Sequence, residues 1–183
     1  PMGVAALDDG TIYVVDYASG ELLRLPGGRV SGEMTSGAAG GTPPSAADGR
    51  SVVASGLEGP VGLALDARGR LLVSEATGGR VVRIDPASGA REVLARGLAQ
   101  PEGLAVLPDG GIAVAEVGAR RLSLLDARGG KPRVIARGLP VGQMFTRTPA
   151  PVFMPTGVAA GDDGTIYVTC DRDNSLLAFR PRR

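Results

Sequence analysis

Short apolar runs separated by polar, glycine-rich turns extend along the whole chain, and their order repeats four times. Each copy opens with a Pro-x-Gly segment followed by Val-Ala or Leu-Ala, at residues 1–5, 60–64, 101–105 and 155–159. A glycine-bearing turn follows, and then a second apolar run at residues 12–15, 71–73, 112–114 and 166–168. Runs of this length, bounded by turn residues, predict β-strands. The pattern therefore predicts a repetitive all-β structure.

Two further apolar runs follow in each complete copy. The third run lies at residues 22–25, 81–84, 122–125 and 176–179, and a fourth, ending in Gly-Leu, lies at residues 52–57, 93–98 and 134–139. The copies span residues 1–59, 60–100, 101–154 and 155–183. Four short strands with their turns need about 40 residues, which the copy at 60–100 fits, while the first and third copies are longer. Runs such as 81–84 are apolar on both faces, as expected for sheets packed between other sheets. The sequence predicts a β-propeller of four-stranded antiparallel blades, the last lacking its fourth strand.

Four such repeats do not account for a closed ring. Propellers have about four to eight blades, and here neither terminus offers a spare strand for the unfinished last repeat. An unmatched edge strand also invites pairing with another chain. We therefore expect residues 1–183 to form one domain or segment of a larger propeller, of about six blades. Self-association through the unclosed edge is a further expectation.

Two insertions lengthen the first and third copies. Residues 32–50 are mostly Gly, Ala, Ser, Thr and Pro, a composition that predicts a mobile loop. Residues 140–154 instead contain apolar side chains, including Phe145 and Phe153. This second insertion is interpreted either as a loop folded onto the rim of its own blade or as a lid over the central cavity.

The composition excludes several classes of function. The chain has 20 basic and 19 acidic residues and 3% aromatic residues, without the basic excess and stacking side chains of a nucleic-acid binder. It contains no histidine, which removes histidine-based acid–base catalysis and Ser-His-Asp triads from these residues. No apolar run is long enough for a membrane-spanning helix. The single cysteine, Cys170, excludes an internal disulfide and is interpreted as a small buried residue.

Two stretches resemble known propeller families. Residues 155–159 with 166–169 and 173–174 resemble an NHL repeat, and residues 58–62 with 69–73 and 79–89 are similar to a blade of the regucalcin and gluconolactonase family. The second resemblance implies a divalent cation, held in the gluconolactonases by Glu, Asn and Asp side chains that point into the axial cavity. Streptogramin-lyase-like propellers are disfavoured here, because their chemistry relies on histidines.

The resemblance identifies candidate site residues. Glu58 matches the Glu-Gly-Pro motif of the gluconolactonases, and Glu102 stands where that family has Asn or Asp. The other Pro-x-Gly positions carry Met2, Val61 and Thr156, which are poor cation ligands. Because calcium takes about six to eight oxygen ligands, the two glutamates would make a weak site at most. The alternative is that Glu58 and Glu102 are exposed turn residues.

A second acidic set recurs just after the second predicted strand. Asp16, Glu75 and Glu116 occupy this place, and the fourth copy has Cys170 followed by Asp171. Recurrence at one repeat position favours a structural role, such as accepting hydrogen bonds from turn amides.

Two functions from different classes follow. The favoured one is a non-catalytic, NHL-like module that binds a protein or a small polar ligand through Met2, Val61, Glu102, Thr156, Phe145 and Phe153. The alternative is a calcium-dependent or other divalent-metal-dependent hydrolase of sugar lactones or esters. In that case Glu58 and Glu102 would hold the cation, and Glu102 would be the catalytic residue.

Overall fold

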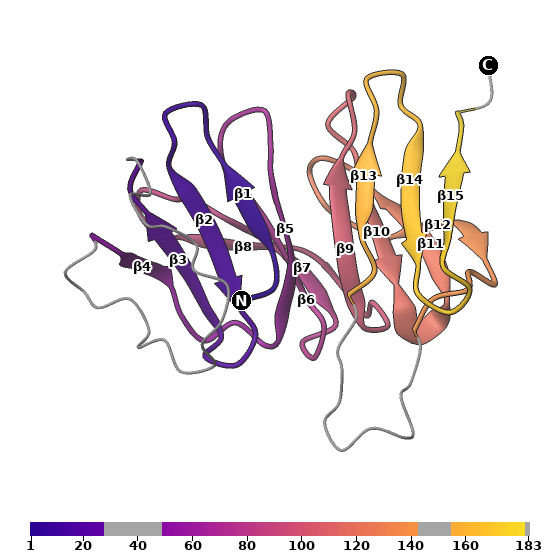
Figure 1. Ribbon diagram of the computed structural model, residues 1–183, viewed down its shortest axis with the longest axis horizontal. Helices are drawn as coiled ribbons and strands as arrows, with labels where there is room; N and C mark the ends of the chain where they lie inside the picture. The colour runs from indigo at the N-terminus through magenta and orange to yellow at the C-terminus, as the bar shows by residue number, and fades with distance from the viewer. Residues whose placement is uncertain (28–48, 143–154, 182–183) are drawn as a thin grey trace, which may run out of the picture.

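A computed structural model describes residues 1–27, 49–142 and 155–181 (Figure 1). Within these ranges the regular structure is fifteen strands and one short 3-10 turn, η2 (Val117–Ala119). No helix there is long and apolar enough to cross a membrane. The predicted all-β class is confirmed.

The strands form four consecutive antiparallel sheets, which we call the first to fourth blades. The first blade contains β1 (Val4–Ala6), β2 (Ile12–Asp16), β3 (Glu21–Leu25) and β4 (Ser51–Ala54). The second contains β5 (Pro60–Leu65), β6 (Leu71–Glu75), β7 (Arg80–Ile84) and β8 (Arg91–Arg96). The third contains β9 (Pro101–Val106), β10 (Ile112–Glu116), β11 (Arg121–Leu125) and β12 (Arg133–Arg137). The fourth contains β13 (Val158–Ala160), β14 (Ile166–Cys170) and β15 (Ser175–Phe179).

Each blade is a meander in which sequential strands pair in order. The turns between the first and second strands contain glycines with positive φ, at Gly10, Gly69, Gly110 and Gly164. This is the conformation that glycine adopts without steric cost. As predicted, three blades have four strands and the last has three within the described residues. The size of a complete ring stays a prediction.

Burial follows the position of each blade in the arc. Every residue of β6 and β10 is buried, because the second and third blades are covered on both faces. In β14, by contrast, burial alternates strictly, since only the face toward the third blade is covered. Three apolar clusters, one at each joint between neighbouring blades, form the core.

Glycine in the Pro-x-Gly motif allows the first strands of neighbouring blades to approach closely. A Cβ on Gly3 would lie 2.6 Å from the Val61 carbonyl oxygen, and one on Gly62 would contact the Glu102 carbonyl. A Cβ on Gly103 would collide with the Thr156 carbonyl and lie 2.7 Å from the Val158 nitrogen. Each glycine therefore accommodates the backbone of the following blade.

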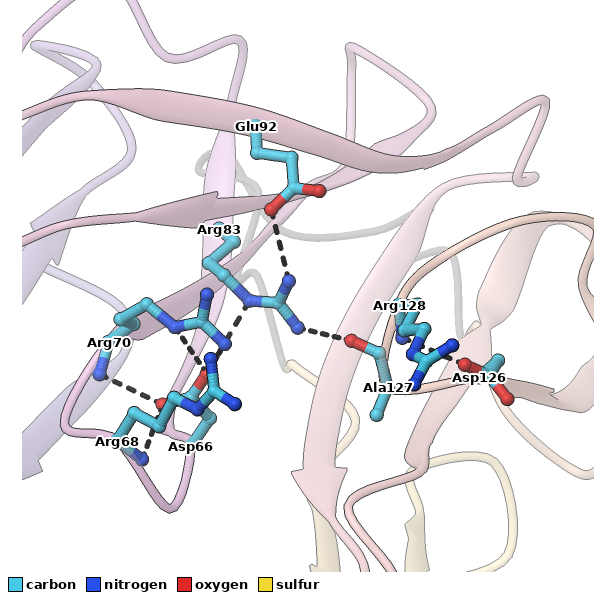
Figure 2. A network of polar contacts seen from close by, with 8 residues as sticks. All are labelled: Asp66, Arg68, Arg70, Arg83, Glu92, Asp126, Ala127 and Arg128. Atoms are coloured by element: carbon cyan, nitrogen blue, oxygen red, sulfur yellow. Dashed lines mark hydrogen bonds and ion pairs between the residues drawn. The ribbon is translucent and has the colours of Figure 1, made fainter.

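A buried arginine closes the joint between the second and third blades (Figure 2). Arg83, on β7, is 7% exposed and lies between Asp66 and Glu92 of its own blade. Its guanidinium donates to Glu92 at 3.0 Å and to the backbone carbonyl of Ala127 in the third blade. The equivalent residue of the third blade is Leu124, which cannot make this bridge.

Candidate functional site

The four x residues of the Pro-x-Gly motifs lie at the start of the blades' first strands: Val61 and Glu102 are the second residues of β5 and β9, and Met2 and Thr156 lie two residues before β1 and β13. Val61, Glu102 and Thr156 are 3%, 6% and 2% exposed, and Met2 is half-buried. Burial of Val61 is ordinary, but burial of a carboxyl group and a hydroxyl on neighbouring blades needs a chemical explanation.

Glu102 and Thr156 face each other across the joint between the third and fourth blades. The Thr156 backbone N–H donates to Glu102 Oε2 at 2.7 Å. The Thr156 hydroxyl oxygen is buried and makes no hydrogen bond of ordinary geometry within the described residues, although it lies close enough to the Glu102 carboxyl group to help lower its pKa. Buried polar side chains are normally paired, so this hydroxyl has unused capacity to donate and to accept.

Asp171 adds a second carboxyl group near this pair. It follows β14, and its Oδ1 accepts from the Gly142 backbone N–H at 2.9 Å. Burial is the main factor that raises the pKa of Glu102, and the charge of Asp171 acts in the same direction, against the hydrogen bond from Thr156. Glu102, Thr156, Asp171 and Gly142 together are called the Glu102 site. The site offers hydrogen-bonding groups in a setting that disfavours additional negative charge.

Replacing Glu102 with Gln tests this electrostatic description. Because the pKa of Glu102 is raised in the folded state, ionisation of this group lowers the stability of the fold at high pH. Below the unfolded pKa of about 4.3, the group is protonated in both states and has no effect on stability. Glu102→Gln keeps an oxygen acceptor for the Thr156 N–H but removes the charge. We expect the variant to gain stability relative to the parent as pH rises from 4 to 8, measured by urea denaturation. A constant difference across this range would contradict the assignment.

Glu58 lies at a different position of the repeat. It aligns with Ala99, whereas Glu102 aligns with Val61. Its side chain is 56% exposed and lies 3.1 Å from the Arg80 guanidinium. Within the described residues no group of three or more acidic, cysteine or histidine side chains could hold a metal ion. Metal binding by Glu58 and Glu102 stays a prediction, and the interpretation of Glu102 as an exposed turn residue is wrong.

The second acidic set has the structural role predicted for it. Asp16 Oδ1 accepts from the backbone N–H groups of Ala18 and Ser19, and Glu75 Oε2 accepts from that of Glu58. Glu75 is fully buried and pairs with Arg80 at 2.6 Å. These carboxylates hold turns and interstrand connections in place.

Glu116 is the most completely bonded member of this set. It is fully buried, and its two oxygens accept from Arg121 Nε at 2.7 Å and Nη2 at 2.6 Å, from the Ser123 hydroxyl at 2.5 Å and from the Ala99 N–H at 2.8 Å. Burial opposes ionisation, but the hydrogen bonds from Arg121 and Ser123 outweigh it and lower the pKa of Glu116. At the equivalent place Cys170 is buried, as predicted, and burial raises the pKa of its thiol.

Other parts of the predicted site have different outcomes. Phe145 and Phe153 lie outside the described residues, as does most of the 140–154 segment. Asp171 and Gly142 were not predicted as site residues. A signal for Asp171 was present: the equivalent residues Tyr17, Ala76 and Val117 are uncharged, so the acid departs from the repeat.

Solved structures establish the fold. No family model matches the sequence, and a search of curated proteins gives no match. A structure from a nidogen–laminin complex matches with a TM-score of 0.67 and 17% identity, covering 93% of this chain and 57% of its own. Virginiamycin B lyase from Staphylococcus aureus, solved with quinupristin, matches with a TM-score of 0.63 and 14% identity, covering 100% and 56%. A Xanthomonas campestris gluconolactonase matches with a TM-score of 0.59 and 18% identity, covering 98% and 75%.

The chain has a β-propeller fold. The predicted resemblance to the NHL and gluconolactonase propellers is thereby confirmed at the level of the fold. The chain spans about half the length of the lyase and nidogen-complex structures. The lyase structure is of a catalytically inactive variant in which a histidine is replaced by alanine, whereas the 183 residues of this chain contain no histidine.

Proposed function

We propose that this chain is a non-catalytic binding module of a β-propeller, and that the Glu102 site receives a small polar ligand. The observation that carries the proposal is the buried pair formed by the Glu102 carboxyl group and Thr156, whose hydroxyl makes no hydrogen bond of ordinary geometry within the described residues. Ligand sites in proteins place a few polar groups of this kind on a rigid, largely apolar framework.

The chemistry of the site restricts the ligand. Glu102 and Asp171 repel each other, so an anionic ligand would be disfavoured. The Glu102 carboxyl group accepts hydrogen bonds, as it does from the Thr156 N–H, and the Thr156 hydroxyl can both donate and accept. These properties support a neutral or cationic molecule with hydroxyl or amide groups.

A metal-dependent lactonase is the competing function, supported by the gluconolactonase structures of similar fold. The described donor set does not fit a calcium site. Within the described residues Glu58 pairs with Arg80 and no three acidic side chains come together, so the carboxylates fall short of the oxygen ligands that calcium takes. We therefore favour binding over hydrolysis.

The decisive experiment combines a turnover assay with a matched hydroxyl deletion. We expect no hydrolysis of glucono-δ-lactone or p-nitrophenyl acetate, with or without calcium. In NMR titrations with a panel of neutral sugars and amides, we expect saturable shifts at the methyl groups of Val61 and Val158. Thr156→Val, which replaces the hydroxyl group with a methyl group, should weaken such binding by about three- to tenfold without lowering stability.

Calcium-dependent turnover abolished by Glu102→Gln would overturn the binding module and favour the lactonase. Binding shifts of equal strength in the parent and in Thr156→Val would contradict the assignment of the site.

A further inference from the structure

A row of three charged side chains crosses the third blade. Glu116 on β10 stands opposite Arg121 on β11, and Arg121 stands opposite Arg137 on β12. Directly opposite residues point to the same face of a sheet. Glu116 alternates with Ile112 and Val114, which pack against the second blade, so the row lies on the face toward that blade and away from the fourth.

This row carries more positive charge than its own carboxylate balances. Glu116 accepts from Arg121, whereas the Arg137 guanidinium is exposed and has no ion pair or hydrogen bond within the described residues. Like charges directly opposite each other are destabilising, so Arg137 adds repulsion to its own blade. Arg96, its equivalent in the second blade, is likewise exposed although the complete third blade follows it.

The second blade has the same row with one more carboxylate. Arg80 pairs with the buried Glu75 at 2.6 Å and with the exposed Glu58 at 3.1 Å. The Glu58 N–H donates to Glu75, and in the third blade the Ala99 N–H donates to Glu116 in the same way. Ala99 is therefore the equivalent of Glu58. The third blade has the backbone of this arrangement and lacks its outer carboxylate.

Two polar residues of the third blade occupy backbone positions that favour glycine. Gln100 and Arg120 both have φ 49°, and their equivalents in the second blade are Gly59 and Gly79, with φ 62° and 59°. Long side chains are uncommon in this left-handed region. Both side chains are exposed, so packing does not explain them. Strained backbone of this kind is often retained where the side chain has a function.

The contacts of these two residues place them beside the row. Arg120 Nε donates at 3.0 Å to the carbonyl oxygen of Leu139, two residues after Arg137, and this bond leaves the outer N–H groups of the guanidinium free. A Cβ on Gly118 would lie 2.9 Å from Gln100 Oε1, so the amide group lies on the turn that leads to Arg120. We call the set of exposed and half-buried side chains at this place the arginine cluster: Gln100, Arg120, Arg121 and Arg137.

We propose that the arginine cluster binds side-chain carboxylates of an acidic segment of a partner protein. One carboxylate binds Arg121 and Arg137 from the side that Glu58 occupies in the second blade. A second binds the outer N–H groups of Arg120 and the Gln100 amide. Guanidinium groups suit this role, because they bind a carboxylate through two parallel hydrogen bonds.

A short acidic segment fits the surroundings better than a nucleic acid or an anionic membrane. Glu58 and Asp173 are exposed at the same end of the two neighbouring blades, where they would repel an extended polyanion. The chain also has few aromatic side chains on which bases could stack. The cluster is separate from the Glu102 site, because Glu102 bonds to the fourth blade, so this proposal does not depend on the function proposed for that site.

The first test is an NMR titration of the full 183-residue chain, at low salt, with blocked hexaglutamate and hexaglutamine peptides. Hexaglutamate should give saturable shifts of the Arg120 Nε–H and the Gln100 side-chain amide, and hexaglutamine should give none. Arg120→Gly, which introduces the glycine found at this position in the first two blades, should weaken binding by about three- to tenfold with little change in the urea midpoint. Arg128→Ala removes the same charge from the turn at the other end of the β11–β12 hairpin and should leave binding unchanged.

A second variant supplies the missing carboxylate from within the chain. Ala99→Glu places an acid where the second blade has Glu58, and this acid should compete for the arginines. We expect it to weaken hexaglutamate binding by at least about tenfold. Ala99→Gln, the uncharged control, should bind hexaglutamate as the parent chain does.

Equal binding by the parent chain, Arg120→Gly and Ala99→Glu would overturn the proposal. Equal weakening by Arg120→Gly and Arg128→Ala would show attraction to overall charge and would also overturn it. Tighter binding of single-stranded DNA or of phosphatidylserine vesicles than of hexaglutamate would contradict an acidic protein segment as the occupant.

Discussion

Replacing Gly103 with alanine is expected to destabilise the protein by about 3 kcal/mol, the upper part of the range for overpacking a well-packed site. The added Cβ would collide with the Thr156 carbonyl and lie 3.0 Å from the Gly157 carbonyl carbon. These atoms belong to the backbone of the next blade, so a side-chain rotation cannot relieve the contact. Urea denaturation should show the loss as a lower midpoint.

Gly157→Ala is the matched control, because Gly157 occupies the same position in the fourth blade. Among the described residues, a Cβ there would meet only the Thr169 side chain, with its hydroxyl at 3.1 Å. We expect a cost below about 1 kcal/mol. Equal costs for the two substitutions would show that the motif glycine serves the strand itself and not the joint between blades.

Replacing Glu116 with alanine is expected to cost about 3 kcal/mol or more, as for other buried ion pairs deprived of one partner. The change leaves Arg121, the Ser123 hydroxyl and the Ala99 N–H without their common acceptor. The pH dependence of stability provides a second measurement. Because the pKa of Glu116 is lowered in the folded state, its stabilisation is present above about pH 4.3 and is lost as pH falls through the folded value.

Asp16→Ala is the control for Glu116→Ala at the same repeat position. Asp16 stands opposite Glu21 on the neighbouring strand, where Glu116 has Arg121. Its side chain is 29% exposed and accepts hydrogen bonds from backbone N–H groups of its own turn. We expect a cost of about 1 kcal/mol. A similar cost for both residues, independent of pH, would contradict the importance of the Arg121 pair.

The strands were predictable from the sequence because each blade repeats the same short apolar runs. The prediction that runs such as 81–84 pack on both faces is confirmed by β7, which is buried from Val81 to Ile84. The fourth strand of the first blade is shorter than the apolar run, ending at Ala54, because the chain leaves the sheet before Leu57. The repeated apolar runs therefore predict the blades, whereas the residue at which each strand ends depends on its hydrogen bonds to the neighbouring strand.

The site was less predictable, because similar motifs conceal different repeat positions. Glu58 precedes a Pro-x-Gly segment, and Glu102 lies within one. Glu58 pairs with Arg80 at the surface, whereas Glu102 is buried beside Thr156. The partners of Glu75 and Glu116 also follow from geometry: Arg80 and Arg121 stand directly opposite them across the hairpin. Such pairing depends on strand register, which the linear sequence does not display.

The hydrogen bond from Thr156 to Glu102 joins a well-enclosed blade to one covered on a single face. Local stability in repeat proteins depends on contacts with immediate neighbours, so the amides of the fourth blade should exchange sooner than those of the second and third blades. A ligand held between Glu102 and Thr156 would engage both sides of that joint. Ligand binding at the Glu102 site would therefore slow the local opening of the fourth blade. A few polar contacts would then change the stability of a neighbouring blade without changing the fold.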